Sequence, residues 1–409
     1  MLRGDCVYYR GEPLDLVPTL NLTRIRPLLE CTLSLTHPID VARLTAAITA
    51  TQTVVPQIMG RYDYRHNRFE VETATAADVV EEYTASHDPG RVQLDVLAGP
   101  QLKVQVIHHA DYDRLRIAMG RSLTDGEGFK HYLYLLAAAY DGQDLTSFTN
   151  ERSGRKILAY LRHPHRPLPQ LQALPTDPPF PQLHGDVHHH QGEAVISRAE
   201  SQRLQRQAKA HGVTLNAVLL AAYALALCTL TGKQHLVIPC QVDLRLHGPV
   251  SAANVVQVAN LTSEIPVPIT VHDFDTLGDV VQRIQATVTR LHTDLAYLTP
   301  LVEIKRMSRA LPPQWVRRLA AKDHATAAVS FANFGRVDQS RLRFDGSAVT
   351  QVTFAGAYHT MPYFQLTVSG YREAWTLAFR MLGSEPDYQL GIKILKNVVT
   401  QLNQWGRTA

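Results

Sequence analysis

Residues Ile117–Phe129 read IAMGRSLTDGEGF, and this stretch decides the fold. The residues before Gly120 belong to an apolar run, Arg114–Met119, that is typical of a buried strand. A helix is expected over Gly128–Tyr140, because one of its faces collects large apolar side chains, namely Phe129, Tyr132, Leu133 and Leu136. The stretch therefore predicts a strand and a helix joined by a short loop that contains Arg121 and Asp125.

The residues on the N-terminal side of this unit predict further strands and one more helix. Alternating or continuous apolar runs predict strands at Leu29–Leu35, Tyr62–Tyr64, Arg68–Val71 and Leu102–Ile107. Asp40 is expected to cap a helix over Val41–Thr53, which Pro56 would end. These elements outline an N-terminal lobe.

The C-terminal half shows equally clear boundary signals. Ser197 and Glu200 predict a capping box, and Thr214 and Gly232 delimit a very apolar helix. Strands and helices are mixed after it. Strands are expected at Leu236–Val242, Ala253–Pro268, Ala327–Phe331, Val349–Phe354, Phe364–Tyr371 and Trp375–Arg380, and helices at Asp275–Leu291 and Tyr388–Trp405. This mixture predicts an α/β fold that contains both hairpins and crossovers.

One break in composition divides the chain. Residues 163–195 are rich in Pro and His and have no helical or strand periodicity, so we expect an extended surface connection there. The predicted organisation is an N-terminal lobe over residues 1–162, this connection, and a C-terminal lobe over residues 196–409. A length of 409 residues also favours two lobes over a single core.

Composition excludes several classes of protein. A net charge of +4 is too small for a nucleic-acid binder, and the four cysteines show no zinc or disulfide spacing, which favours the cytoplasm. The first twenty residues lack the apolar run of a signal peptide. The most apolar stretch, Leu215–Leu230, is too short for a membrane span, so we expect a buried core helix there and no span.

Four segments, taken in order, resemble a known family. The loop at Ile117–Phe129 is similar to the HHxxxDG motif of condensation domains and related acyltransferases, which have the chloramphenicol acetyltransferase-like fold. Pro239–Arg245 (PCQVDLR) resembles a P-x-x-V-D-L-R segment of alcohol-acetyltransferase-like members, and Asn254–Glu264 resembles the segment that follows it. Ser330–Asp338 (SFANFGRVD) resembles the SNFG-type segment near the C-terminus. The resemblance, which also extends to polyketide-associated acyltransferases, implies two lobes with mixed sheets and a tunnel or cleft between them.

The resemblance also implies roles for the loop residues. The second His of the motif would act as the base in the tunnel, the Asp would pair with an arginine that fixes the loop, and the Gly would permit close approach of backbone and substrate. Asp125 and Gly126 occupy the last two positions, and Arg245 is the expected partner of Asp125. Asn333 and Gly335 are the matching structural residues of the later segment.

The centre of the motif differs from the family. Gly120 stands where the first His is expected and Arg121 where the catalytic His is expected. A guanidinium stays protonated and cannot accept a proton, although it can bind an anion or stabilise an oxyanion. His359 is a candidate substitute base, because the strands after the SNFG-like segment line the tunnel in the family. Asp125 is a second alternative, as a lone catalytic acid.

Other histidine and basic clusters have simpler readings. His108 and His109 imitate the motif but are followed by a turn rather than by glycine. A metal site formed by His184, Asp186 and His188–His190 is the alternative to a polar loop, and no metal is expected. A helical region carries a run of basic residues, namely Lys305, Arg306, Arg309, Arg317, Arg318 and Lys322. This run is either a solvated face or a contact for an anionic carrier.

These observations lead to three functional hypotheses. The first is an acyltransferase that binds an acyl thioester and an alcohol or amine acceptor. Coenzyme A or phosphopantetheine would carry the thioester, and an acyl carrier protein is a further candidate partner. No permanently bound cofactor is expected. The second is a binding or recruiting homologue without acyl transfer. The third is an altered enzyme that uses Arg121 electrostatically. Because Arg121 is not a base, we expect little transfer to simple alcohols and amines, and expect Arg121→His, alone or with Gly120→His, to raise a residual rate.

Overall fold

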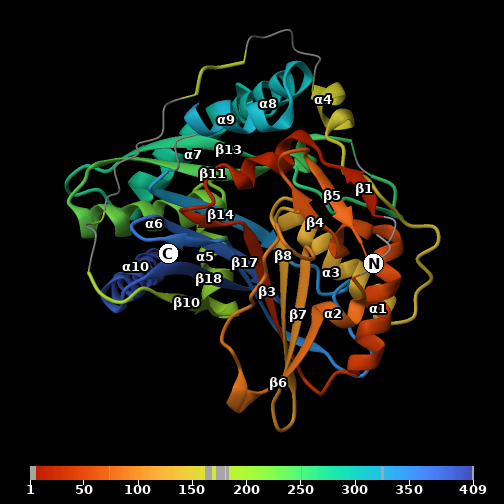
Figure 1. Ribbon diagram of the computed structural model, residues 1–409. Helices are drawn as coiled ribbons and strands as arrows, with labels where there is room; N and C mark the ends of the chain where they lie inside the picture. Colours follow the sequence, from red (N-terminus) through yellow and green to blue (C-terminus); the bar gives the residue numbers. More distant parts are fainter. Residues whose placement is uncertain are drawn as a thin grey trace.

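The computed structural model describes residues 6–72, 74–161, 168–171, 180, 184–249, 251–323 and 327–407. Within these residues, an N-terminal sheet has the strand order β15-β3-β8-β7-β6. Its strands are β3 (Leu28–Leu35), β6 (Val80–Thr84), β7 (Leu102–His108), β8 (Asp113–Gly120) and β15 (Val349–Ala355). Helices α1 (Val41–Val54), α2 (Ala76–Val79) and α3 (Gly126–Tyr140) lie beside this sheet (Figure 1).

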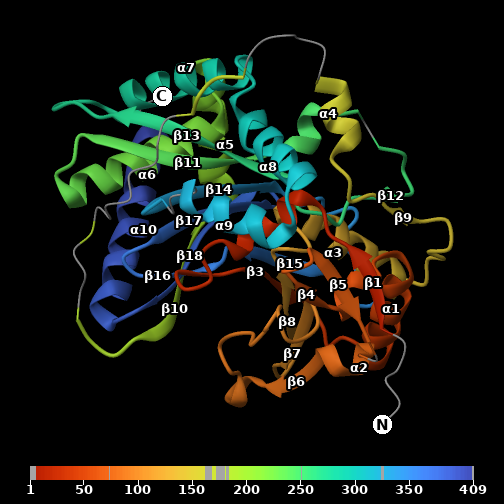
Figure 2. The same ribbon diagram turned by 45° about the horizontal axis from the view of Figure 1, so that its top comes forward.

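A larger sheet occupies the other half of the molecule, in the order β13-β11-β14-β17-β18-β16-β2, and β10 also pairs with β18. Its strands are β2 (Ile25–Arg26), β10 (His188–Ile196), β11 (His235–Asp243), β13 (Thr262–Thr270), β14 (Val329–Arg336), β16 (Tyr358–Thr360), β17 (Phe364–Tyr371) and β18 (Ala374–Gly383). The helices around it are α5 (Arg198–Ala210), α6 (Leu215–Thr231), α7 (Leu277–Thr293) and α10 (Glu385–Trp405). Figures 1 and 2 show the two sheets in separate lobes.

Smaller elements complete the described fold. Strands β1 (Val7–Arg10), β4 (Arg61–Asp63) and β5 (Arg68–Val71) form a small sheet, and β9 (Thr149–Asn150) pairs with β12 (Val255–Val256). Helices α4 (Arg155–Leu161), α8 (Thr299–Ala310) and α9 (Pro313–Asp323) lie at one end of the molecule, at the top of Figure 1. Short 3-10 turns are η1 (Pro13–Thr19), η2 (Pro56–Met59), η3 (Ala85–His87), η4 (Leu244–His247) and η5 (Ala296–Leu298).

Each lobe has its own apolar core, and the chain crosses between the lobes. The described buried apolar side chains fall into two clusters, one around the N-terminal sheet and one around the larger sheet. Strand β15 comes from the C-terminal half but pairs with β3, whereas β2 comes from the N-terminal half but pairs with β16. The lobes are therefore tied together by exchanged strands. The mixed α/β class is confirmed, and the lobe boundaries at 162 and 196 stay a prediction.

Most local signals lead to the expected elements. Asp40, Ser197 and Thr214 cap α1, α5 and α6, and Gly232 ends α6 with a φ of 68°. Helix α6 is buried over most of its length, as expected for a core helix. Among the described residues, no single helix meets the length and hydropathy required of a membrane span. The bent pair of α5 and α6 meets them only together, across a 104° bend.

Two expectations about strands are wrong. His188–Ile196 forms β10, although no strand was expected within 163–195, because the edge of β18 offers backbone partners along all nine residues. The single strand expected over Ala253–Pro268 is divided into β12 and β13. The intervening backbone turns away because it bonds to Asp125 and Arg245 instead of to a neighbouring strand.

Candidate functional site

The loop between β8 and α3 lies where the two lobes meet, and Asp125 anchors it. Asp125 begins α3 by accepting a hydrogen bond from the Gly128 N–H at 2.8 Å through Oδ1. Its other oxygen, Oδ2, accepts from Leu261 N at 2.6 Å and Thr262 Oγ1 at 2.9 Å. One buried carboxylate thus caps an N-terminal helix and binds the backbone of the C-terminal lobe.

Arg245 completes this anchor, and the expected ion pair is present. Its Nη1 lies 3.0 Å from Asp125 Oδ2 and 2.8 Å from Asp243 Oδ1. Its Nη2 donates to the carbonyls of Gln257 and Ala259 at 3.0 and 2.8 Å. Burial opposes the charge of Asp125, but Arg245 and the N–H donors outweigh it and lower the pKa of this carboxyl. Burial raises the pKa of Asp243 to about 6, with partial compensation from Arg245.

A second arginine that the sequence analysis missed holds the same loop. The Nη2 of Arg152 donates to the carbonyl of Leu123 at 3.0 Å and forms an ion pair with Asp15 at 3.1 Å. Its Nε donates to the carbonyl of Val258 at 3.3 Å. Arg152 follows β9 and has no motif around it, so only its burial in the fold reveals this role.

Gly126 is required by a neighbouring ring. A Cβ at this position would overlap the ring of Phe334 on β14, which packs against the start of α3. The resemblance had suggested close approach of backbone and substrate, but here the space belongs to Phe334. Gly335, the next residue, has a φ of 68° at an irregularity in β14, a conformation that favours glycine.

Asn333 connects this bulge to α6. Its Nδ2 donates to Oδ1 of Asn216 at 3.0 Å, and its Oδ1 accepts from Gly335 N at 2.8 Å. Asn333 and Gly335 therefore shape the strand that carries Phe334 to the loop. Their contribution to function stays a prediction.

Gly120 lacks space for the histidine of the family motif. A Cβ there would overlap Oε1 of Gln101 and would lie 2.9 Å from Val96 Cγ1. Gln101 is fully buried and donates to the carbonyls of Gly60 and Val96. Gly120→His is therefore an unsuitable companion to Arg121→His, because the Gln101 side chain fills the position that the new imidazole would need.

Arg121 is half-buried and differs from the other loop residues in its lack of partners. Its backbone N–H donates to the Pro27 carbonyl at 2.8 Å, but its guanidinium forms no hydrogen bond or ion pair with any described residue. Burial lowers the pKa of this guanidinium, while the charges of Glu264 and Asp125 act in the opposite direction. Arg121 thus presents a guanidinium without a hydrogen-bond partner among the described residues, within electrostatic reach of Glu264, a residue that the sequence analysis did not single out.

His359 lies on β16, within electrostatic reach of Arg121, and is 4% exposed. Neither of its ring nitrogens has a hydrogen-bond partner among the described residues. Burial, followed by the charge of Arg121, lowers the pKa of His359 to about 3, and the Gln365 side chain acts in the opposite direction. At neutral pH this imidazole is uncharged, with one nitrogen free to accept a proton.

The other histidine clusters have structural partners. His108 bonds to Asp113 at 2.9 Å and to Glu82 at 3.1 Å, and these bonds outweigh burial and raise its pKa. His109 stacks on Tyr112 in the expected turn. No group of three metal-ligating side chains forms among the described residues, which include His184 and His188–His190.

The basic run on α8 and α9 is partly engaged. Arg317 donates to the carbonyl of Thr19 at 2.7 Å and covers the ring of Tyr64. Arg318 lies over Trp315. The side chain of Lys322 lies outside the described residues. A carrier contact at this face stays a prediction.

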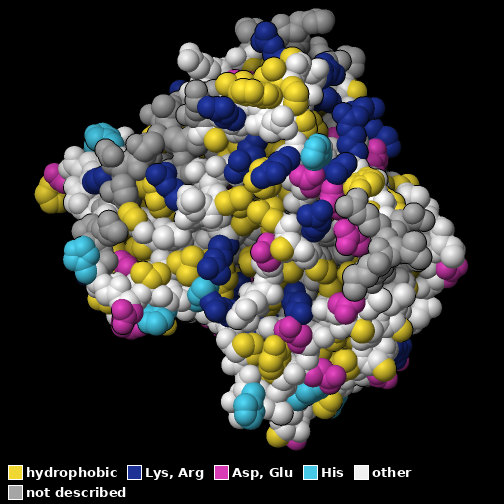
Figure 3. Space-filling view, viewed as in Figure 1, with side chains coloured by type: hydrophobic (Ala, Val, Ile, Leu, Met, Phe, Trp, Pro, Cys, Tyr) yellow, Lys and Arg dark blue, Asp and Glu magenta, His cyan; other side chains and the backbone are white. Residues whose placement is uncertain are grey.

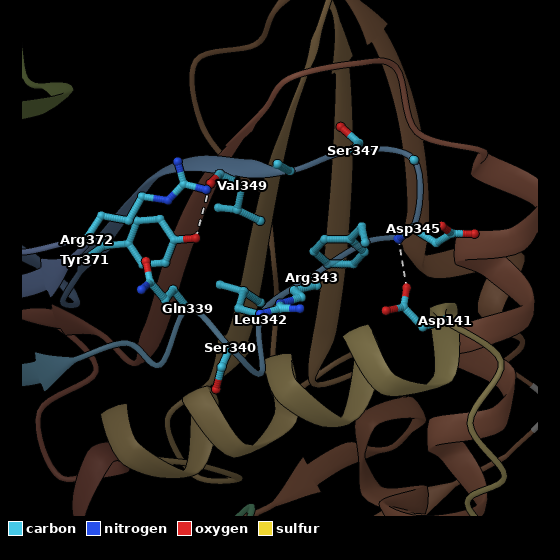
Figure 4. A pocket seen from close by; sticks show the side chains of 13 residues that line it. Asp141, Gln339, Ser340, Leu342, Arg343, Asp345, Ser347, Val349, Tyr371 and Arg372 are labelled. Carbon is cyan, nitrogen blue, oxygen red and sulfur yellow. Dashed lines mark hydrogen bonds between the residues drawn. The ribbon is translucent and has the colours of Figure 1, made fainter.

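A cavity of about 710 Å³ lies elsewhere, between the segment 339–349 and the β17–β18 hairpin. Figure 4 shows Tyr371 and Arg372 at one end of it and Asp141 and Asp345 at the other. None of Arg121, Asp125 or His359 lines this cavity. The tunnel implied by the resemblance also stays a prediction.

Solved structures of the same fold support this description. Polyketide synthase associated protein 5 from Mycobacterium tuberculosis has a TM-score of 0.67 at 16% identity, with 100% of this chain and 99% of that chain covered. The condensation domain of the monacolin K polyketide synthase gives 0.65 at 15% identity, with 98% of each covered. Trichothecene 15-O-acetyltransferase from Fusarium sporotrichioides gives 0.64 at 13% identity, with 98% and 96% covered. These proteins share the two-lobed fold of this chain.

A search of curated proteins finds no match. The family description "Condensation domain" matches residues 149–379, which is more than half of the chain. The match includes Arg245, the backbone that binds Asp125, and the strand that carries His359. The chain belongs to the condensation-domain family.

Proposed function

We propose that this protein binds an acyl thioester, carried by coenzyme A or phosphopantetheine, and transfers the acyl group slowly to an alcohol or amine. The supporting observation is the pair formed by Arg121 and His359. Arg121 occupies the family's base position without being a base, and His359 is a buried neutral imidazole whose ring nitrogens lack partners. The charge of Arg121 acts on His359, which lies on a strand of the other lobe.

In the proposed reaction, an acceptor hydroxyl attacks the thioester carbon while its proton passes to a ring nitrogen of His359. Arg121 stabilises the oxyanion that forms on the carbonyl oxygen. The C–S bond then breaks, the carbonyl re-forms, and the thiolate takes the proton from His359 and leaves as a thiol. A histidine with a pKa of about 3 is a weak base at neutral pH, so this step is slow.

The same pKa favours a second candidate, which is a homologue that binds thioesters without transfer. The two functions differ in one measurement, namely acceptor-dependent thiol release from acetyl- and longer acyl-coenzyme A. We expect slow release by the parent protein and a decrease of about 10² in His359→Gln, the lower end of the range for general-base catalysis, because a base with so low a pKa is poorly matched to neutral pH. His235→Gln, which removes an exposed imidazole on β11, is the matched control.

Two further variants test the role of Arg121. Arg121→Ala should lower the rate through loss of oxyanion stabilisation, and Arg121→His should raise it by restoring a base. Gly120→His is omitted because of Gln101. Thioester binding without release in any variant would select the non-catalytic function. Release that none of these substitutions changes would place the reaction elsewhere.

A further inference from the structure

A second cavity, of about 470 Å³, lies between the lobes on the side of β16 that carries Tyr358. Its polar lining includes Arg26 on β2, Arg91 in the segment before β7, and His189 on β10. Its apolar lining is Leu28, Val92, Leu94 and the ring of Tyr358. Figure 3 shows Lys or Arg and His side chains near the notch in the outline of this face of the molecule.

The two arginines of this cavity bond to a neutral histidine instead of pairing with acids. Nη1 of Arg26 lies 2.9 Å from Nε2 of His189, and Nη1 of Arg91 lies 2.9 Å from the same nitrogen. Neither guanidinium has a carboxylate partner among the described residues. Burial, followed by the charges of Arg91 and Arg26, lowers the pKa of His189 to about 4.

Nearby carboxylates are occupied by other groups. Glu30 pairs with the buried Arg380 and Arg116, and Asp88 accepts two bonds from Arg116, at 2.8 and 3.0 Å. Asp95 lines the cavity, but its Oδ1 accepts from the N–H groups of Leu97 and Ala98 within its own turn. Two arginines thus face one acid, and the local charge is positive.

The cavity is distinct from the site at Arg121. Tyr358 pairs directly with Arg26 across β16 and β2, so their side chains share one face of the strands. His359 is the next residue and belongs to the opposite face, because successive side chains alternate along a strand. The cavity and the buried His359 are therefore separated by β16.

From this arrangement we infer that the cavity binds an organic phosphate. Arg26 and Arg91 hold the phosphoryl oxygens, since guanidinium groups match phosphate geometry with several donors. His189 accepts from both guanidinium groups and so holds them together, and the organic part of the ligand rests on Tyr358, Leu28 and Val92. The inference depends on the charges of the cavity and holds whether or not the chain transfers acyl groups.

The test is calorimetric titration with coenzyme A, adenosine 3',5'-bisphosphate, inorganic phosphate, pantetheine and acetate. We expect the first two to bind, inorganic phosphate to bind more weakly, and pantetheine and acetate not to bind. Arg26→Ala and Arg91→Ala should each weaken binding about tenfold or more, as expected for charge-assisted hydrogen bonds. Arg24→Ala, an exposed arginine of the same segment that stacks on Tyr363, should leave binding unchanged.

The ligand series also separates two sources of the phosphate. Coenzyme A binding more tightly than the bisphosphate would identify a thioester carrier, and equal affinities would identify a nucleotide. The inference is overturned by absence of phosphate binding, by equal losses in Arg24→Ala, or by acetate binding as tightly as phosphate. As a second readout, phosphate should raise the pKa of His189 in an NMR titration, and an unchanged value would also contradict the inference.

Discussion

Asp125 and Arg121 belong to the same short loop, yet their surroundings differ sharply. Asp125 is surrounded by donors from Gly128, Leu261, Thr262 and Arg245, so its charge is fully compensated. The guanidinium of Arg121 forms no hydrogen bond or ion pair with a described residue, and the ring nitrogens of His359 nearby form no hydrogen bond with one. A buried charge with complete partners holds the fold together, whereas polar groups left without partners are available to a ligand. We therefore call Asp125 the structural end of the loop and Arg121, on the proposed function, its functional end.

The largest expected effect is at the structural end. Asp125→Ala leaves Arg245 buried with one of its two carboxylates, and loss of one partner of a buried ion pair costs about 3–5 kcal/mol. Arg121→Ala removes an unpaired cation and should change the free energy of unfolding by about 0.5 kcal/mol or less. Urea unfolding of both variants measures the difference. Similar losses in the two variants would remove the distinction between the ends of the loop.

The pH dependence of the parent supplies a control for this prediction. Because the folded-state pKa of Asp125 is lowered, its contribution is present above the unfolded-state pKa of about 4 and is lost as the pH falls through the folded-state value. Asp125→Asn should remove this part of the acid sensitivity. An unchanged acid unfolding profile in Asp125→Asn would contradict the assignment.

An intermediate effect is expected at Gly126. Gly126→Ala places a methyl group into the ring of Phe334, and overpacking of this kind costs about 1–3 kcal/mol. Gly99→Ala is the control, since the nearest atom to its new Cβ is the Asp95 carbonyl oxygen at 3.6 Å. Thermal unfolding should show a loss only at Gly126. In the double variant Gly126→Ala/Phe334→Leu the two losses should be less than additive, and strict additivity would show that the ring is not the cause.

The smallest expected effect concerns the functional end. His359 should stay neutral between pH 5 and 8 in an NMR titration, and Arg121→Ala should raise its pKa, because the charge of Arg121 helps to lower it. The folded-state pKa of His359 lies below its unfolded-state pKa of about 6.5. The contribution of His359 to the free energy of unfolding should therefore fall as the pH drops below about 6.5. Arg206→Ala, on the exposed face of α5, should leave the titration of His359 unchanged. A His359 pKa near 6.5 in the parent would show that the imidazole is solvated.

Much of the fold follows from local signals. The caps at Asp40, Ser197 and Thr214 and the glycine after α6 act within one turn of the chain, so they can be read without knowledge of distant residues. The motif segments, taken in order, indicated the family and the Asp125–Arg245 pair. Strand β10 escaped prediction, because its pairing depends on the free edge of β18 and not on its own periodicity.

By resemblance to the HHxxxDG motif, the amino-acid sequence by itself predicted that Arg121 stands at the position of the base and that Asp125 and Gly126 stand at the last two positions of the motif. Only the tertiary structure decided what surrounds them. Phe334 occupies the space at Gly126, and Gln101 occupies the space at Gly120. His359 comes within electrostatic reach of Arg121, and Arg26 bonds to His189, through pairings between strands that are far apart in the chain. Such contacts depend on how the sheets assemble, and no local pattern specifies that assembly.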